Sequence, residues 1–485
     1  MSFQPVVGRI DDDPIVRAFS RTASRFGSRS LVVSVLRHAT AGEIDALSRA
    51  IVAELLAPLP PGGLVGLAAP NGPAFLAGFI ALRRARQTVL LLDAAAPVED
   101  RTRAAALLGA RNVMECSTSW TTTAGQFQLR RIEGASEPFA LSAIAAVKLT
   151  SGSTGAPRGV AMTADALLAD EQALITTMGL RSDDRLMASL PWSHSYGFTT
   201  LAMSAIVRGL PLLIPASNDP LAPLVDGAPL GATVLPTVPA YVQALVKMSC
   251  PPALPDTVRL VMSAGAPLPV ETARRFRELY GRSIHAFYGS SECGGICYDR
   301  EGGAAERGTV GTPVDGVAVT LSPRDDLESG GIVTIASAAV GQGYVPESDP
   351  RLTPGRFQTS DTATWRDGEL VLERRIDRVI HVRGRKVDPG EVEGVLVQLH
   401  GVEDAVVFGT PVPGRADEIV RAVISSAWPH VIPADVVAWC SGRLAAHKVP
   451  RTVVVLPTIP RTARGKIDWR AIRALTDGEN GLNSV

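Results

Sequence analysis

Short apolar runs alternate with helix-like patterns along most of the chain. Residues 64–70 read LVGLAAP, residues 74–86 have the spacing of a helix, and residues 88–93 read TVLLLD. Such alternation is typical of parallel βαβ units, in which buried strands are connected by helices. The alternation resumes after residue 163 and continues to the run SIHAFYG at residues 283–289. The pattern predicts an α/β fold with a large domain of layered sheets.

The pattern changes twice in the last third of the chain. Between residues 308 and 358 glycines and prolines are dense and the apolar runs are short, which predicts a small antiparallel β subdomain. A charged, strand-like stretch follows, and then Asp388 and Glu391 are placed as the N-cap and capping-box acid of a helix. The sequence therefore predicts an N-terminal domain over residues 1–374 and a smaller α+β domain over residues 378–485.

Composition narrows the class of partner. The chain has 485 residues, more than one core usually accommodates, and 46% of them are hydrophobic. Lys plus Arg and Asp plus Glu both number 48, so the formal net charge is zero. A neutral chain offers no electrostatic case for binding nucleic acid or an acidic membrane. Small molecules are the expected partners.

The cysteines and the apolar segments indicate where the chain functions. Five widely spread cysteines favour a reducing compartment over a disulfide framework. Cys293 and Cys297 form a CxxxC pair, but no second pair completes a metal site, so packing is the favoured interpretation. The most apolar region, residues 64–96, is interrupted by prolines and arginines, and the N-terminus lacks the features of a signal peptide. We expect no membrane span and a cytoplasmic location.

The stretch VKLTSGSTGAPRGVAMT, residues 147–163, has the composition of a phosphate-binding loop. An apolar strand pattern ends in hydroxyl and glycine residues and is followed by the cation Arg158. Backbone N–H groups and hydroxyls can hold an oligophosphate, and glycines let the main chain approach it. An ordinary Gly/Ser turn is the alternative, and the spacing is not that of a Walker loop. The candidate phosphate ligands are Thr150, Ser151, Gly152, Ser153, Thr154, Gly155 and Arg158.

The string TSGSTGAPRG resembles the signature loop of the acyl-adenylate-forming superfamily, which includes acyl-CoA synthetases, adenylation domains of peptide synthetases and beetle luciferases. In that superfamily the loop holds the β- and γ-phosphates of ATP. The usual last cation is lysine, so Arg158 is a departure that keeps the charge but changes the donor geometry. The resemblance also implies that the C-terminal domain is mobile and pivots at a hinge, here near Asp377.

A second motif, YGSSE, begins at Tyr288 and resembles the superfamily's other nucleotide motif. The resemblance implies that Tyr288 stacks on adenine, that Ser291 bonds a phosphate oxygen, and that Glu292 binds Mg²⁺ as a hard carboxylate. A strand-to-loop junction with a solvated acid is the alternative. Upstream, the string SAGAP resembles the loop that lines the adenine and acyl sites. These motifs add the nucleotide-binding candidates Gly265, Ala266, Tyr288, Gly289, Ser290 and Ser291.

Further matches follow downstream in the superfamily's order. Asp361, in Thr-Ser-Asp where the superfamily has Thr-Gly-Asp, is expected to accept both ribose hydroxyls, and Arg375 is expected to join it. Charged side chains in surface turns are the alternative. Lys386 matches a position that often carries a basic group near the phosphates. Lys466, in PRTARGKIDW, matches the lysine that bridges the carboxylate and the α-phosphate in the transition state.

His194, in LPWSHSYGF, matches the position that flanks the acyl carboxylate and gates the pocket. The alternative is a histidine satisfied in the core. Amino-acid-activating members carry an aspartate in this segment to hold the substrate ammonium, and this stretch has none. Without such an acid the ammonium would be buried unpaired, so we expect amino acids to be poor substrates. A fatty acid is the first expectation and an aryl acid the second.

Together these motifs predict an AMP-forming acid–thiol ligase. It would use ATP and Mg²⁺ to convert a small-molecule carboxylic acid to acyl-AMP with release of pyrophosphate, and would then transfer the acyl group to a thiol. CoA is the first expected acceptor, and the phosphopantetheine arm of an acyl or peptidyl carrier protein is the alternative. A non-catalytic ligand-binding relative is a third interpretation, which the joint presence of Glu292, Asp361 and Lys466 disfavours.

Overall fold

The chain forms two compact units. The computed structural model describes residues 13–136, 143–151, 157–217, 219–323, 330–375, 380–382, 385–411, 418–426, 431–462 and 467–477. The first unit consists of residues 1–322, 333–359 and 365–371, and the second of residues 323–332, 360–364 and 372–485. The predicted hinge residue Asp377 lies outside the described residues, and the predicted domain limits remain a prediction.

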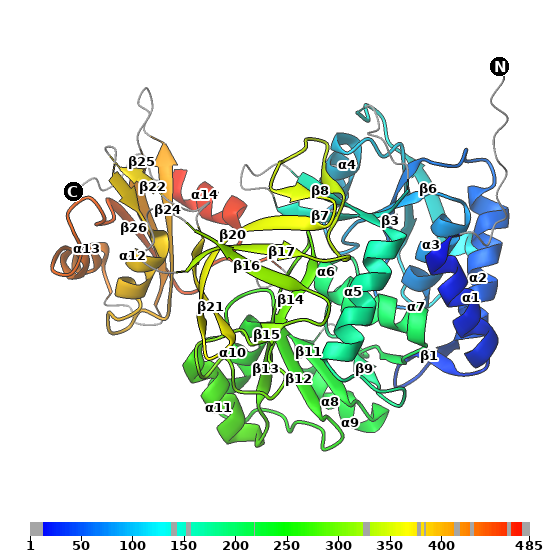
Figure 1. Cartoon of the computed structure of the whole chain (residues 1–485), viewed down its shortest axis with the longest axis horizontal. Coiled ribbons are helices and arrows are strands. Elements are labelled where there is room, and N and C mark those ends of the chain that lie inside the picture. Colours follow the sequence, from blue (N-terminus) through cyan, green and yellow to red (C-terminus); the bar gives the residue numbers. More distant parts are fainter. Residues whose placement is uncertain are drawn as a thin grey trace. The chain divides into compact units, whose positions relative to one another are not determined.

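A seven-stranded sheet forms one layer of the first unit (Figure 1). Its order is β18 (Gly343–Val345), β8 (Pro157–Thr163), β7 (Ile144–Ser151), β4 (Thr88–Leu91), β3 (Leu64–Ala68), β5 (Asn112–Cys116) and β6 (Phe127–Arg131). The central strands β7, β4, β3 and β5 are parallel, whereas β18, β8 and β6 run antiparallel to their neighbours. Parallel strands are covered on both faces, which explains the near-continuous apolar runs of β3 and β4.

A nine-stranded sheet forms a second layer of the same unit. Its order is β15 (Thr312–Pro313), β14 (Gly294–Tyr298), β13 (Ile284–Ser290), β12 (Leu260–Ala264), β11 (Val234–Thr237), β9 (Leu186–Met187), β10 (Leu212–Leu213), β1 (Ser30–Val33) and β2 (His38–Thr40). The strands from β13 to β1 are parallel, and β14, β15 and β2 are antiparallel additions at the two edges.

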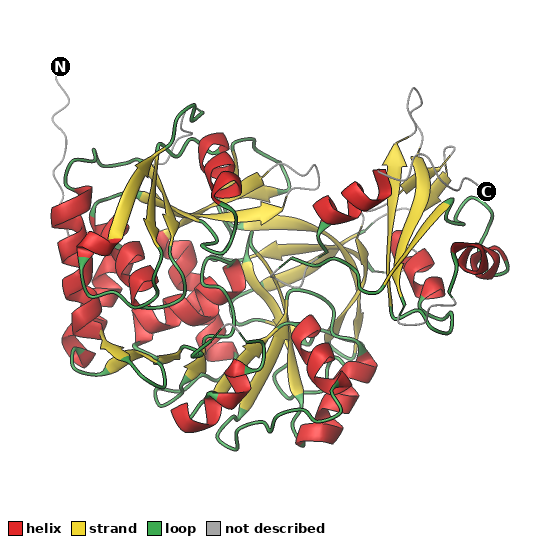
Figure 2. Cartoon of the chain, turned by 180° about the vertical axis from the view of Figure 1, so that it is seen from behind, coloured by secondary structure: helices red, strands yellow, loops and turns green. Residues whose placement is uncertain are grey.

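Helices lie between the two sheets and on their outer faces (Figures 1 and 2). The inner layer contains α1 (Pro14–Phe26), α2 (Ala41–Ile51), the π-helix η1 (Val52–Leu56), α3 (Pro73–Arg84), α5 (Ala164–Thr177), α6 (Ser195–Gly197), the π-helix η3 (Phe198–Met203) and α7 (Ser204–Arg208). The others are α4 (Val98–Leu107), the 3₁₀ turn η2 (Ala124–Gln126), α8 (Ala222–Val225), α9 (Gly227–Leu230), α10 (Pro239–Lys247) and α11 (Val270–Tyr280). Nearly every residue of α3 is buried, as expected for a helix enclosed between two layers.

Helix α5 carries two buried acids on an otherwise apolar face. Glu171 is neutralised by Arg208 of α7, whose Nε and Nη2 lie 3.0 and 3.1 Å from the two carboxylate oxygens. The neighbouring Asp170 is also buried and accepts a hydrogen bond from the backbone N–H of Gly295. Glu171 is thus paired with an opposite charge, and Asp170 is hydrogen-bonded to the backbone, so each buried carboxylate has a polar partner.

Short strands occupy the region for which a β subdomain was predicted. They are β16 (Ala318–Ser322), β17 (Gly331–Ala336), β19 (Leu352–Thr353), β20 (Arg356–Arg366) and β21 (Glu369–Arg375). β19 and the start of β20 form an antiparallel pair, with Leu352 opposite Phe357. Both units take residues from this region.

The second unit contains a three-stranded sheet, a hairpin and flanking helices. The elements are β22 (Ile380–Val382), β23 (Arg385–Val387), α12 (Pro389–Leu396), β24 (Asp404–Pro411), β25 (Glu418–Ser425), α13 (Pro433–Ser441), β26 (Thr452–Leu456) and α14 (Trp469–Asp477). Asp388 caps α12 as predicted, because its carboxylate accepts a hydrogen bond from the backbone N–H of Gly390 at 2.8 Å. The capping-box role predicted for Glu391 is wrong. Its carboxylate instead binds Lys448 Nζ at 2.6 Å.

Within the described part of the chain, no helix has the length and apolar character needed to cross a membrane.

Candidate active site

Several predicted site residues follow strands that end at one edge of the nine-stranded sheet. β9, β11, β12 and β13 are parallel, so their carboxyl ends share that edge, where α/β sheets commonly bind ligands. Ala264, the last residue of β12, pairs with Phe287 of β13. Gly265 follows Ala264 and Tyr288 follows Phe287, so these two residues lie at the same height along the neighbouring strands. Glu292 lies in the turn after β13. The structure thus places the SAGAP and YGSSE motifs side by side.

The base of the predicted phosphate loop is an antiparallel hairpin. Strands β7 and β8 pair Thr150 with Arg158 and Ser151 with Pro157. The Thr150 hydroxyl donates to the Arg158 carbonyl at 3.4 Å, which joins the two ends of the loop. The loop residues predicted to hold phosphate, Gly152, Ser153, Thr154 and Gly155, lie outside the described residues.

Tyr344 connects the hairpin with the YGSSE motif. Its strand, β18, pairs with β8 so that Tyr344 lies opposite Val160. The Tyr344 hydroxyl donates a hydrogen bond of 2.8 Å to Glu292 Oε1, and the Arg158 guanidinium stacks over the Tyr344 ring, 3.9 Å from its centroid. Burial and the charge of Glu292 raise the pKa of Tyr344, so the tyrosine remains a hydrogen-bond donor. One side chain thereby holds the predicted phosphate cation and the predicted metal ligand together.

The side chain of Arg158 is oriented from a second direction by Asp349. Its Nη1 lies 3.6 Å from Asp349 Oδ2, and Arg351 binds the same carboxylate at 2.7 Å. Hydrogen bonds from Arg351, together with the charges of Arg351 and Arg158, lower the pKa of Asp349 to about 2. A planar guanidinium can stack on Tyr344 and bind Asp349 at the same time, which suits arginine better than the lysine usual at this position.

The surroundings of Glu292 fit a hard cation that is shared with a nucleotide. Glu292 is partly exposed, and its carbonyl accepts a hydrogen bond from the backbone N–H of Gly341 at 2.8 Å. No cluster of three or more His, Cys, Asp or Glu side chains suitable for a metal occurs among the residues that the structure describes. Mg²⁺ is commonly bound by one or two carboxylates plus phosphate oxygens and water, so a single carboxylate beside a phosphate loop is a suitable donor set.

His194 lies in a segment that other parts of the chain hold in place. The Asn71 side chain donates to the Leu190 carbonyl at 2.7 Å and accepts from the Trp192 backbone N–H at 2.8 Å. Two residues after the histidine, the ring of Tyr196 packs on Phe287 of β13, with centroids 5.4 Å apart. These contacts bring the histidine segment to the same edge of the sheet as the YGSSE motif.

An aspartate from another part of the chain lies beside His194. Asp93, which follows β4, places its Oδ2 3.2 Å from His194 Nε2, and both side chains are largely buried. The segment around the histidine does lack an aspartate, but the fold supplies one from a residue about a hundred positions earlier.

The predicted ribose ligands are neighbours within the second unit. Arg375 Nε lies 3.6 Å from Asp361 Oδ1, and the carboxylate is the less exposed partner. Lys386 lies in β23 opposite His381. Lys466, the predicted catalytic lysine, is outside the part of the chain that the structure describes. The pairing of Asp361 with Arg375 agrees with their expected joint role, which remains a prediction.

Sequence reasoning missed Tyr344, Asp93 and the buried pair Lys148 and Asp170. Only Lys148 gave a signal in the sequence, because it interrupts the apolar run that forms β7. The structure shows that its side chain is completely buried. Tyr344 and Asp93 belong to no motif, and their roles follow from strand pairing.

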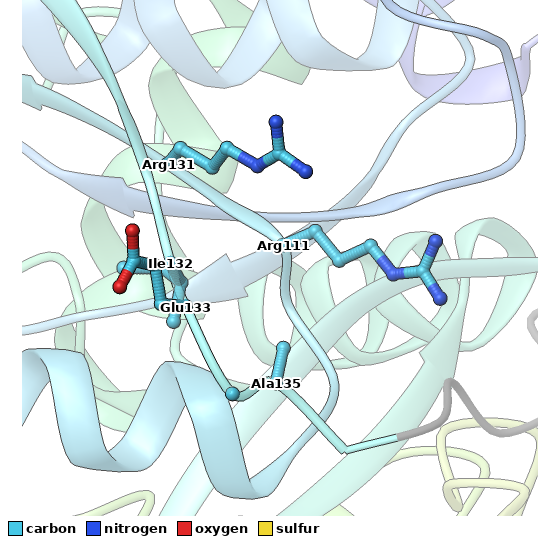
Figure 3. Close-up of a pocket in the computed structure, with 6 residues that line it drawn as sticks. Arg111, Arg131, Ile132, Glu133 and Ala135 are labelled. Atoms are coloured by element: carbon cyan, nitrogen blue, oxygen red, sulfur yellow. The ribbon is translucent and has the colours of Figure 1, made fainter.

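A separate pocket of about 420 Å³ near the edge strand β6 is lined by none of the predicted site residues (Figure 3). It is lined by Arg111, Arg131, Ile132, Glu133, Gly134 and Ala135.

Comparison with known proteins decides the family. The AMP-binding enzyme family matches residues 19–345, and the AMP-binding enzyme C-terminal domain matches residues 391–466. The chain belongs to the AMP-binding enzyme family. This confirms the predicted superfamily and the predicted class, an ATP-dependent, AMP-forming acid ligase.

Individual relatives cover nearly the whole chain. Feruloyl-CoA synthase from an Amycolatopsis species is 28% identical over 471 residues, which are 92% of this chain and 94% of that protein. Oxalate–CoA ligase from Arabidopsis thaliana is 27% identical over 506 residues, 96% of this chain and 98% of that protein. The chain is thus similar throughout its length to enzymes named as CoA ligases.

Solved structures show the same fold. O-succinylbenzoate CoA synthetase from Bacillus subtilis, solved with an acyl-adenylate intermediate, matches with a TM-score of 0.77 and 20% identity over 94% of this chain and 97% of that one. The same synthetase has been solved with ATP and a magnesium ion. This match confirms the predicted α/β fold with layered sheets in a large domain and a smaller C-terminal domain.

Proposed function

We propose that this enzyme activates a carboxylic acid without an α-amine and transfers the acyl group to CoA. In the first half-reaction a carboxylate oxygen of the acid attacks the α-phosphorus of ATP, and pyrophosphate leaves. In the second the CoA thiolate attacks the acyl carbon, and AMP leaves. The relatives named as CoA ligases support CoA as the acceptor.

The connection of Arg158 to Glu292 through Tyr344 is the observation that carries the proposal. It joins the proposed phosphate cation Arg158 to the proposed metal ligand Glu292, which is 134 positions later in the sequence. An oligophosphate with a bound cation needs both groups at once, because the loop donors bind phosphate oxygens and the carboxylate binds the metal. A Gly/Ser turn with a solvated acid would not require this connection.

In the proposed first half-reaction, the phosphate loop and Arg158 hold the β- and γ-phosphates and orient ATP for in-line attack. Glu292 would hold Mg²⁺, which neutralises charge on the phosphate oxygens when it is bound. Asp361 and Arg375 would bind the ribose, and Lys386 would lie near the phosphates. Lys466 would bind the oxygens at which charge develops in the transition state.

The acyl site is proposed to accept a fatty acid first and an aryl acid second. His194 would flank the acyl carboxylate, and the aromatic contact between Tyr196 and Phe287 supplies apolar surface next to it. Asp93 is engaged with His194, so we propose that it positions the imidazole and does not pair a substrate ammonium. An α-amino acid would then leave its ammonium unpaired in a buried site, which is unfavourable.

We propose domain limits at residues 1–374 and 378–485, with Asp377 as the hinge residue. The two half-reactions would use different orientations of the smaller domain. This proposal follows from the resemblance of residues 375–377, which read Arg-Ile-Asp, to the superfamily's hinge segment.

A pyrophosphate-release assay with and without CoA tests the proposal. We would compare octanoate, benzoate, a hydroxycinnamate, oxalate and phenylalanine, and identify thioesters by mass spectrometry. We expect release with octanoate or an aryl acid and a CoA thioester as product. Fast release with phenylalanine alone would contradict the acyl-site assignment. Adenylate that reacts with a phosphopantetheinylated carrier protein but not with CoA would identify the alternative acceptor.

A further inference from the structure

Lys148 is a completely buried lysine beneath the phosphate loop. It lies in β7 two residues before Thr150, and because side chains alternate along a strand the two residues share one face of the sheet. Its Nζ atom has no hydrogen-bond partner among the residues that the structure describes. An isolated buried ammonium is very unfavourable, so its location requires a compensating charge.

Asp170 of α5 supplies that charge. It is the main electrostatic partner of Lys148, followed by Cys293 and Glu292. Burial lowers the pKa of Lys148 and raises that of Asp170, and the attraction between the two side chains opposes both shifts. The pair spans the interior, because Lys148 belongs to the seven-stranded sheet and the Asp170 helix packs on β14 of the nine-stranded sheet. The two side chains thus attract one another within the interior, without a hydrogen bond from Lys148 Nζ to Asp170.

Asp170 also contacts the start of β14, two residues after Glu292. Its Oδ1 accepts a hydrogen bond of 3.1 Å from the backbone N–H of Gly295. The carboxylate lies so close to Gly294 that a Cβ on that residue would be 2.1 Å from Oδ1, and Gly294 has a φ of +71°. A glycine is therefore required at position 294 both by conformation and by the approach of Asp170. The second oxygen, Oδ2, has no hydrogen-bond partner in the described residues.

We propose that Lys148 and Asp170 are positioning residues for the metal carboxylate. Asp170 holds the start of β14 at Gly294 and Gly295 and so sets the place of Glu292 in the preceding turn, while Lys148 balances the buried charge of Asp170 from the strand that leads into the phosphate loop. The two residues would thereby connect the phosphate-binding and metal-binding parts of the site from the interior. This inference rests on the proposed role of Glu292.

A purely structural role is the competing explanation, and α5 contains a matched control. Glu171, adjacent to Asp170, is equally buried and charge-paired, but its partner is Arg208 on α7 and not the start of β14. Loss of either charge pair should destabilise the fold, because one buried charge remains unpaired. Only loss of the Lys148 and Asp170 pair should change the binding of Mg²⁺ with ATP.

The test measures ATP affinity by calorimetry without an acid substrate, once with Mg²⁺ and once with EDTA, beside thermal unfolding. The dissociation constant measured with EDTA divided by the one measured with Mg²⁺ reports how much Mg²⁺ strengthens ATP binding. We expect D170L, which has no acceptor for the Gly295 N–H, and K148M to lower this ratio by about tenfold, the usual size for residues that support a metal ligand. E171Q should lower the unfolding midpoint and leave the ratio unchanged. E292Q should abolish the contribution of Mg²⁺.

The double variant K148M/D170L keeps the test decisive if a single variant fails to fold. It leaves no unpaired charge, so it should unfold near the wild-type midpoint, and it should retain the lowered ratio. A wild-type ratio in D170L or in the folded double variant would overturn the proposal, as would an equal loss in E171Q. A wild-type ratio in E292Q would instead refute the metal role of Glu292, on which the proposed function depends.

Discussion

Tyr344 connects two parts of the proposed nucleotide site that lie far apart along the chain. Its ring supports the guanidinium of Arg158, and its hydroxyl binds the carboxylate of Glu292. These two contacts use different parts of one side chain, so each can be removed separately. A lysine in place of Arg158 would keep the charge but would lose the planar stacking on the ring.

The variant Tyr344→Phe removes the hydroxyl and keeps the ring under Arg158. We expect the KM for Mg·ATP to rise about tenfold, because a hydrogen bond to a charged group contributes about 1.5 kcal/mol. The KM for the acid should stay close to the wild-type value. Steady-state kinetics with varied Mg·ATP checks this, and an unchanged KM for Mg·ATP would show that the hydroxyl does not position Glu292.

Asp349 should make stability depend on acidity. Its pKa in the folded protein is about 2, below the value of about 3.9 expected in an unfolded chain, because Arg351 and Arg158 favour the ionised form. A lowered folded pKa contributes stability above about pH 4, and this contribution is lost as the pH falls from about 4 to about 2. Since the site is partly exposed, the effect should be at most about 1 kcal/mol.

Urea unfolding of wild type and Asp349→Asn at several pH values measures this contribution. The difference in the free energy of unfolding should be largest between about pH 5 and 7 and should shrink as the pH approaches 2. A difference that stays constant across the range would show that the charge of Asp349 does not stabilise the fold.

At the scale of elements, short segments hold His194 in place by close backbone contact. Helix α6 begins directly after His194, and Gly197 in this helix lies against the preceding segment. A Cβ at residue 197 would be only 2.2 Å from the carbonyl oxygen of Pro191, and a backbone atom cannot move aside without shifting the segment. The glycine is therefore needed for the position of the histidine.

The variant Gly197→Ala should destabilise the protein by about 1 to 3 kcal/mol and raise the KM for the acid, because relief of the overlap displaces the histidine segment. Gly125→Ala is the matched control, since a Cβ at Gly125 meets no atom within 4 Å. Urea unfolding and steady-state kinetics compare the two variants. If Gly197→Ala were as stable and as active as the control, the segment could not depend on this contact.

At the scale of the whole molecule, the proposed reaction separates into two halves that depend on different residues. Lys466 is proposed to act only on acyl-AMP formation, because it binds the oxygens that gain charge in that step. The variant Lys466→Ala should lower the rate of pyrophosphate release by about 10² to 10³, the usual loss for one such transition-state contact.

Thioester formation from synthetic acyl-AMP and CoA provides the internal control for the Lys466 variant. It should remain close to the wild-type rate, because the adenylate is already formed. Nearly normal pyrophosphate release by the variant, or an equal loss in both half-reactions, would reject the assignment of Lys466 to the first step.

The sequence by itself determined the features that depend on neighbouring residues. Alternating strand and helix patterns are local, so they predicted the α/β fold and the α+β composition of the C-terminal region. The motifs around Thr150, Tyr288 and Asp361 are local as well, since each places its donors within a few residues. The local capping prediction failed at Glu391, whose carboxylate binds Lys448, a side chain 57 positions away.

Only the tertiary structure decided which distant residues meet. Tyr344 reaches Glu292 because β18 pairs with β8 in one particular register, and Asp93, which follows β4, lies beside His194 from a distant part of the chain. Lys148 and Asp170 come into the same interior because α5 packs on both β7 and β14. Such contacts depend on sheet order, register and the packing of layers, which arise from interactions over the whole chain and leave no local pattern in the sequence.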